Sequence, residues 1–182
     1  MRRQSDRTSA EARFRGVFAH LGLVTAYARR RGSPDPEAVA AEVMTVAWRR
    51  LADVPLDDPR PWLYATARNV LLAEWRLRSR ADTWTDLRES RAAADEVPLH
   101  ELMDADVLAA LRSLTVADRE ALLLVAWEDL SPKLAAEALD IGHAAFRVRL
   151  HRARARFRRA LEDGRRAGLA AMPLNPLEVE ER

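Results

Sequence analysis

Apolar and polar residues alternate with helical spacing through the first 80 residues. Between Glu11 and Arg31 apolar side chains recur every three or four positions, and Gly32 follows as a stop signal. A second amphipathic segment starts at Asp35-Pro36, an N-cap and first-turn pair, and runs to about Leu51. A third runs from about residue 61 to residue 80, after a Pro- and Asp-rich loop over 52–61. The pattern predicts a bundle of three helices.

The segment that follows loses this periodicity. Between residues 81 and 106 the chain carries eight acidic residues and only two arginines. Polar, highly charged segments of this kind bury too little apolar surface to fold by themselves. We therefore expect a flexible acidic linker over residues 81–104.

Helical periodicity returns with Val107 and continues through three shorter segments. Thr115 to Asp118 resembles a capping box and opens a helix that reaches Trp127, and Ser131-Pro132 caps a short helix that ends near Leu139. A tight break over 140–143 precedes a long helix from about residue 144 to residue 161. Two short helices, a tight turn and a basic helix form the helix-turn-helix arrangement. The fold class predicted for the chain is therefore all-α, with two small helical domains.

The long carboxyl-terminal helix has one apolar face and one basic face. Phe146, Leu150, Ala153 and Phe157 fall at spacings of four, three and four, so they are predicted to face inward. Seven arginines and no acidic residue lie between Ala144 and Ala160, on a chain whose net charge is only +2. Arginine neutralises phosphate and can pair with guanine through two hydrogen bonds. This distribution predicts an anionic partner, duplex DNA, for this helix.

Composition excludes several other classes of protein. The 182 residues contain no cysteine, so disulfides, thiolate nucleophiles and Cys-ligated zinc are absent. No apolar run is long enough to cross a membrane, and the basic start lacks the apolar core of a secretory signal. The four histidines are scattered, without a metal-ligand or triad spacing, and no glycine-rich phosphate loop is present. We expect a soluble cytoplasmic protein that is not an enzyme, with no metal, no cofactor, no membrane insertion and no small-molecule substrate.

Two blocks of the sequence also resemble one known family. Region 4 of extracytoplasmic-function (ECF) sigma factors resembles three fragments of the carboxyl-terminal part: ADREALLL, LSPKLAAEAL and VRLHRAR. Region 2 of the same family resembles two amino-terminal segments: PDPEAVAAEVMTVAWRRL and DDPRPWLYATARNVLLAEWRLRSR. Asp140 stands where the family has a turn glycine, and Ala144-Ala145 stands where it has Gly-Thr. Gly142 is then expected to supply the turn in a shifted register. Trp48 and Trp62 are expected to pack in the core over much of their surface.

The resemblance implies a domain plan and a set of contacts. Region 2 would span residues 1–80, the linker 81–104, region 4 residues 105–163, and a loose tail 164–182. Residues implied for the minus-35 element are His143, Ala145, Arg147, Val148, Arg149, His151, Arg152 and Arg154. Residues implied for the minus-10 element are Asp58, Arg60, Trp62, Arg68, Asn69 and Arg76. Residues implied for polymerase docking are Glu37, Glu42, Arg49 and Arg50.

The function implied is delivery of core RNA polymerase to promoter DNA, with an anti-sigma factor as a further partner. Two alternatives remain open from the sequence. One is an ordinary helix-turn-helix regulator that binds a two-fold symmetric operator without polymerase. The other is a sigma-like adaptor or decoy that has lost promoter recognition, an alternative favoured by the alanines at 38, 73, 144 and 145.

Overall fold

The computed structural model describes the backbone of residues 2–81 and 104–171, and the side chains of residues 8–78 and 104–166. In these ranges the regular secondary structure is helical, as the sequence predicts. The elements are α1 (Arg2–Phe18), α2 (Leu21–Arg30), α3 (Pro36–Arg49), the 3-10 turn η1 (Leu51–Asp53), α4 (Arg60–Ala81), α6 (Ala105–Arg112), α7 (Val116–Ala126), α8 (Pro132–Ala138) and α9 (His143–Ala171). The predicted acidic linker, apart from its two end residues, lies outside the described residues.

The first predicted helix is two helices, so the amino-terminal half (α1–α4) contains four helices rather than three. The backbone N–H of His20 bonds the carbonyl of Val17, which closes a tight turn between α1 and α2. This turn lets both helices pack on α3, with Val17 buried from α1 and Val24 and Ala28 buried from α2. The expected stop is confirmed, because Gly32 adopts a φ of 72° just after α2.

Helices α3 and α4 complete the amino-terminal half. The Asp35 carboxylate accepts a hydrogen bond from the backbone N–H of Ala38, so the predicted cap of α3 is confirmed. Val39 and Val43 of α3 are fully buried, and Leu63 and Leu71 of α4 pack in the same core. These side chains hold α4 against the bundle along its whole first half.

The carboxyl-terminal half (α6–α9) is the predicted helix-turn-helix with one preceding helix. Thr115 caps α7 and Ser131 caps α8, each by accepting a backbone N–H three residues on. Phe146, Leu150 and Ala153 are buried, so the inward face of α9 is confirmed, and Phe157 packs partly buried beside it. The helix continues to Ala171, beyond the predicted end near residue 161 and into the predicted tail. Residues 172–182 of that tail lie outside the described residues.

The turn between α8 and α9 differs from the expectation. Asp140 itself adopts the left-handed conformation, with a φ of 51°. Gly142 is not among the positive-φ glycines of the described residues, so the expected shift in register is wrong. Aspartate tolerates the left-handed region better than most residues because its short side chain bonds locally. The turn between α8 and α9 therefore lies at the position expected from the resemblance, with Asp140 in place of the family's glycine.

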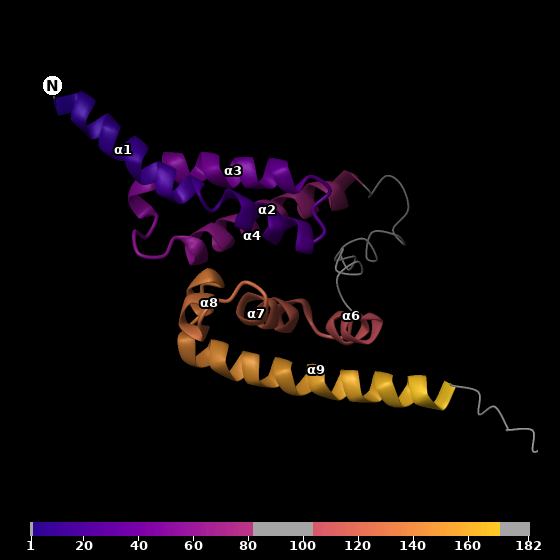
Figure 1. Cartoon of the computed structure of the whole chain (residues 1–182). Coiled ribbons are helices and arrows are strands. Elements are labelled where there is room, and N and C mark those ends of the chain that lie inside the picture. The colour runs from indigo at the N-terminus through magenta and orange to yellow at the C-terminus, as the bar shows by residue number, and fades with distance from the viewer. Residues whose placement is uncertain (1, 82–103, 172–182) are drawn as a thin grey trace, which may run out of the picture.

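The two halves lie against each other in a layered arrangement. Figure 1 shows α1–α4 on one side, α9 on the opposite side, and α7 and α8 between them. Helix α8 packs directly on α4, and the buried apolar side chains of both halves belong to one continuous cluster. The promoter-directed surfaces predicted on α4 and α9 are thus held in one body.

Candidate nucleic-acid interface

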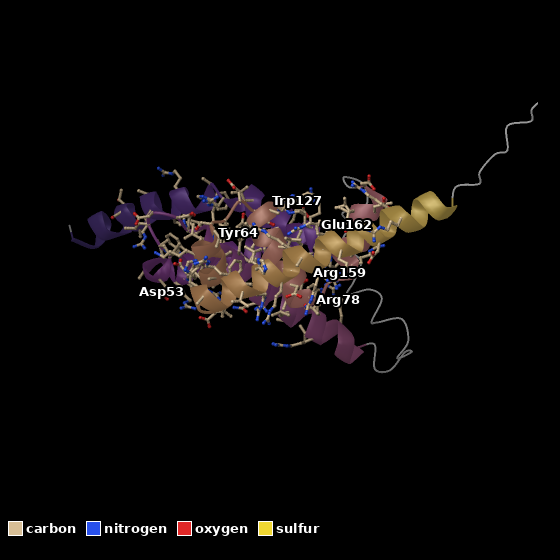
Figure 2. All side chains as sticks on the ribbon, turned by 90° about the horizontal axis from the view of Figure 1, so that it is seen from below. Asp53, Tyr64, Arg78, Trp127, Arg159 and Glu162 are labelled. Atoms are coloured by element: carbon tan, nitrogen blue, oxygen red, sulfur yellow. The ribbon has the colours of Figure 1, made fainter. Side chains whose placement is uncertain are left out.

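The outward face of α9 presents a row of basic side chains on a rigid support. Arg147, Arg152 and Arg154 are exposed, and no described acidic side chain pairs with any of them. Figure 2 looks onto α9, which crosses the front of the molecule and carries the labelled Arg159. Because their charges are not neutralised within the described chain, these arginines are available to phosphate or guanine.

Most of the residues predicted for the minus-35 element share this face. His143, the first residue of α9, and Ala145, Arg147, Val148, His151, Arg152 and Arg154 are all exposed. Val148 is 51% exposed although it is apolar, which suits contact with the methyl group of thymine. Arg149 is the exception, since it is half-buried and lines a cavity of about 240 Å³ between the two halves.

Asp58 and Arg60, two residues predicted for the minus-10 element, form an ion pair at the start of α4. The Asp58 carboxylate accepts the backbone N–H and the guanidinium of Arg60, at 3.0 Å and 2.7 Å. The hydrogen bond from the Arg60 side chain holds the pKa of Asp58 below its usual value. This pair lines a cavity of about 360 Å³ together with the loop 55–59.

The same cavity includes residues that sequence reasoning missed. Arg13 and His20 line it from α1 and the turn after α1, and the Arg13 guanidinium donates a hydrogen bond to the Val54 carbonyl at 2.7 Å. Arg13 lies 41 positions before Val54, so no local sequence pattern links the two. Charged and apolar residues line this cavity together, and it could receive an unstacked base.

The other residues predicted for the minus-10 element follow α4. Trp62 is half-buried, with the guanidinium of Arg50 lying 6.0 Å from the centre of its ring. Arg68, Asn69 and Arg76 are exposed. Arg68 lines the same inter-half cavity as Arg149, so the structure brings one predicted minus-10 residue and one predicted minus-35 residue to a single place.

The residues predicted for polymerase docking are all exposed on or just after α3. Glu37 pairs with Arg29 at 2.9 Å, and Arg50 pairs with Asp53 at 2.8 Å. Beside them lies an apolar groove of about 460 Å³ lined by Phe14, Phe18, Met44 and Trp48 among others. Trp48 is 46% exposed, so about half of its surface is buried, and its ring packs edge-on against Phe14 at 5.0 Å.

The described side chains contain no group of three His, Asp or Glu placed to hold a metal ion. No helix among the described residues is long and apolar enough to span a bilayer.

Comparison with known proteins identifies both the module and the fold. Residues 104–157 match the family model described as sigma-70, region 4. The solved structure of CnrH in complex with the cytosolic domain of CnrY is 27% identical, with 82% of this chain and 88% of that chain covered and a TM-score of 0.57. The matched segment covers α6, α7, α8 and the first half of α9, and the likeness in fold extends over both halves. The chain is an ECF-type sigma factor.

A second solved structure has the same fold as this sigma factor. It is the sigma factor RpoE in complex with the anti-sigma factor NepR from Bartonella quintana, 20% identical, with 81% of this chain and 95% of that chain covered and a TM-score of 0.60. No curated protein matches the sequence. Each alignment covers more than four fifths of this sigma factor and of the solved neighbour. Both halves of this sigma factor therefore have counterparts in each solved structure.

Proposed function

We propose that this sigma factor binds core RNA polymerase in the cytoplasm and directs it to promoters with two recognition elements. The observation that carries the proposal is the exposed face of α9 inside the segment that matches region 4, where Arg147, Arg152 and Arg154 pair with no described acidic side chain. A rigid helix with its base-reading residues in the first turns fits the major groove. The polymerase supplies the chemistry, so this chain has no catalytic residue of its own.

The two halves take different roles in this proposal. The half that spans residues 105–163 reads the minus-35 element through Arg147, Val148 and Arg152. The half that spans residues 1–80 docks on polymerase through α3 and handles the minus-10 element through α4. The recess beside Asp58 and Arg60 receives one flipped base, at an unstacking cost of a few kcal/mol that stacking and polar contacts offset.

Control by an anti-sigma factor belongs to the same proposal. Both solved neighbours were captured as complexes, one of them with a protein named as an anti-sigma factor. The apolar groove beside Trp48 and the inter-half cavity are the described surfaces on which such a partner could act.

A binding titration tests base reading by α9. The full chain, bound to core polymerase, is titrated with promoter duplexes that differ at single minus-35 positions, at several salt concentrations. Arg152→Ala should reduce the binding free energy by about 1–3 kcal/mol and relax the base preference at one position only. Arg158→Ala should weaken binding to all sequences equally and lower the slope of log K against log salt by about one unit. Equal losses for both variants on every sequence would reduce α9 to an electrostatic anchor.

A further inference from the structure

Two adjacent arginines at the end of α2 and just beyond it hold two glutamates of the other half. Arg31 donates to Glu120 at 3.0 Å and to Glu128 at 3.1 Å, and Arg30 pairs with both carboxylate oxygens of Glu128. Tyr27 donates its hydroxyl to Glu120 at 2.8 Å. The Glu128 side chain is only 2% exposed and that of Arg31 only 6%. We call this group, Tyr27, Arg30, Arg31, Glu120 and Glu128, the inter-half cluster.

The two arginines belong to a wider basic face of the amino-terminal half. Arg68 lines the same cavity as Arg31, and Arg30 and Arg60 both lie close enough to Tyr64 to act on its hydroxyl. Opposite these four arginines the other half presents Glu120, Glu128 and Asp129, all on or just after α7. An acidic surface of one half therefore covers a basic surface of the other.

The contact geometry is the one that arginine uses for phosphate. Arg30 meets Glu128 through Nε and Nη2, and Arg31 meets Glu120 through the same pair of nitrogens. This fork fits carboxylate and phosphate oxygens alike. A phosphodiester could replace each glutamate without any change in the position of the arginines.

The covered face also includes residues already assigned to the promoter. Arg60 and Arg68 are two of the residues proposed for the minus-10 element, and α8 packs directly on α4, which carries both. Arg60 is half-buried and Arg68 stays exposed in this packing, whereas Arg30 and Arg31 are largely covered. Nucleic acid therefore reaches the whole of this basic face only when the halves separate. Because taking an ion pair out of water costs about as much as the pairing returns, buried pairs of this kind add little net stability, and separation into water is feasible.

We propose that Arg30 and Arg31 form a binding site for DNA backbone phosphates, which Glu120 and Glu128 fill while the two halves are together. The proposal rests on the proposed function, because it places the site beside the α4 residues that handle the melted promoter. The site would give the sigma factor two further phosphate contacts. Glu120 and Glu128 would compete with DNA for the two arginines.

The experiment compares glutamine substitutions on the full chain. Glu120→Gln with Glu128→Gln removes both competing charges, and Glu137→Gln with Glu162→Gln makes the same change in net charge at two exposed residues without a described partner. The probe is a 30-nucleotide single strand of mixed sequence. We expect the first double variant to bind at least tenfold more tightly than the second.

The arginines are then tested in the opened background. Adding Arg30→Gln and Arg31→Gln to Glu120→Gln/Glu128→Gln should abolish the gain. It should also lower the slope of log K against log salt by about 1.4, from two contacts at about 0.7 each on a single strand. Circular dichroism and thermal melting check that each variant is folded.

Separation of the halves is followed independently. The natural chain has no cysteine, so Ala41→Cys on α3 and Lys133→Cys on α8, both exposed, take a donor and an acceptor dye without background. Energy transfer should fall in Glu120→Gln/Glu128→Gln and not in the control. If affinity for the strand equals that of the control variant, whether or not the halves separate, the phosphate site is overturned.

The result is distinguishable from failure of the proposed function. Wild-type chain and core polymerase are assayed in parallel for promoter-dependent transcription. If the chain supports transcription but the predicted change in DNA affinity is absent, the phosphate site is wrong and the proposed function stands. If the predicted change in affinity is found but the chain supports no transcription, the phosphate site stands and the proposed function is wrong.

Discussion

Arg156 of α9 bonds the carboxylate of Asp118, the third residue of α7. The Asp118 side chain is 10% exposed and its own backbone N–H is bonded by Thr115, so the carboxylate is fixed at the start of α7. The pair therefore ties the middle of the basic helix to the helix that lies behind it. One of the seven arginines between residues 144 and 160 is thus engaged in holding the helix-turn-helix rather than facing DNA.

The role of this pair can be measured by comparing two neighbouring arginines. Arg156→Ala should lower the free energy of unfolding by about 1 kcal/mol, because it leaves a largely buried carboxylate without its hydrogen bond. Arg154→Ala, which removes an exposed arginine with no described partner, should change it by less than about 0.5 kcal/mol. Urea unfolding followed by circular dichroism measures both. Equal losses would mean that the Asp118 contact contributes nothing.

The left-handed turn residue gives a second prediction. Asp140→Val places a β-branched residue at a φ of 51° and should lower the free energy of unfolding by about 1–2 kcal/mol. Asp140→Gly at the same position is the matched control and should be tolerated, because glycine adopts this conformation freely. If the valine variant is as stable as wild type, the backbone at this turn does not have the left-handed conformation.

The two tyrosines report on the contact between the halves. Burial raises the pKa of Tyr27 above 10.0, and burial with the nearby Glu128 charge raises the pKa of Tyr64 to about 12. Since both folded pKa values are raised, the stability that each group contributes is complete below pH 10. It is lost as the pH rises above 10, through about 12 for Tyr64.

Ultraviolet absorbance of the phenolate follows this titration directly, because Tyr27 and Tyr64 are the only tyrosines in the sequence. Folded wild type should titrate well above pH 10, and Glu120→Gln/Glu128→Gln should titrate closer to the value of the unfolded chain. A folded wild type whose two tyrosines titrate near pH 10 would show that the halves are apart in solution.

Polymerase docking through α3 is tested by charge reversal. Glu42→Lys with Arg49→Glu changes two exposed side chains while Val39 and Val43 keep the helix packed, so core binding should fall with no loss of helical content. Glu137→Lys with Arg112→Glu makes the same exchange on the carboxyl-terminal half and should bind core polymerase normally. Gel filtration with core polymerase measures both. Normal binding by the α3 variant would remove the docking assignment.

Local sequence signals predicted most of the helices for identifiable reasons. The N-caps Asp35, Thr115 and Ser131 each make the expected side-chain hydrogen bond. The inward face of α9 followed from the 3.6-residue period alone. Such signals can be found in the sequence because the capped N–H group or the next residue of the apolar face lies within about one helical turn of the residue that indicates it.

The features that sequence reasoning missed depend on distant partners. The turn at His20 has no proline and no glycine, and it exists because α1 and α2 pack separately on α3. Arg31 and Glu120 lie 89 positions apart, and both look like ordinary surface residues in a sequence with 30 basic and 28 acidic side chains. The candidate site was therefore predictable as a set of exposed residues on α4 and α9, while the surface that covers α4 was not.

Run-off transcription with core polymerase tests whether this chain directs promoter-specific initiation. The templates form a library in which the minus-35 and minus-10 elements are randomised, and the full chain is compared with core polymerase alone. We expect transcripts that start at fixed sites and enrich two separate sequence blocks, and we expect Arg152→Ala to relax one position of the upstream block only. Transcription no greater than that of core polymerase alone would overturn the proposed function.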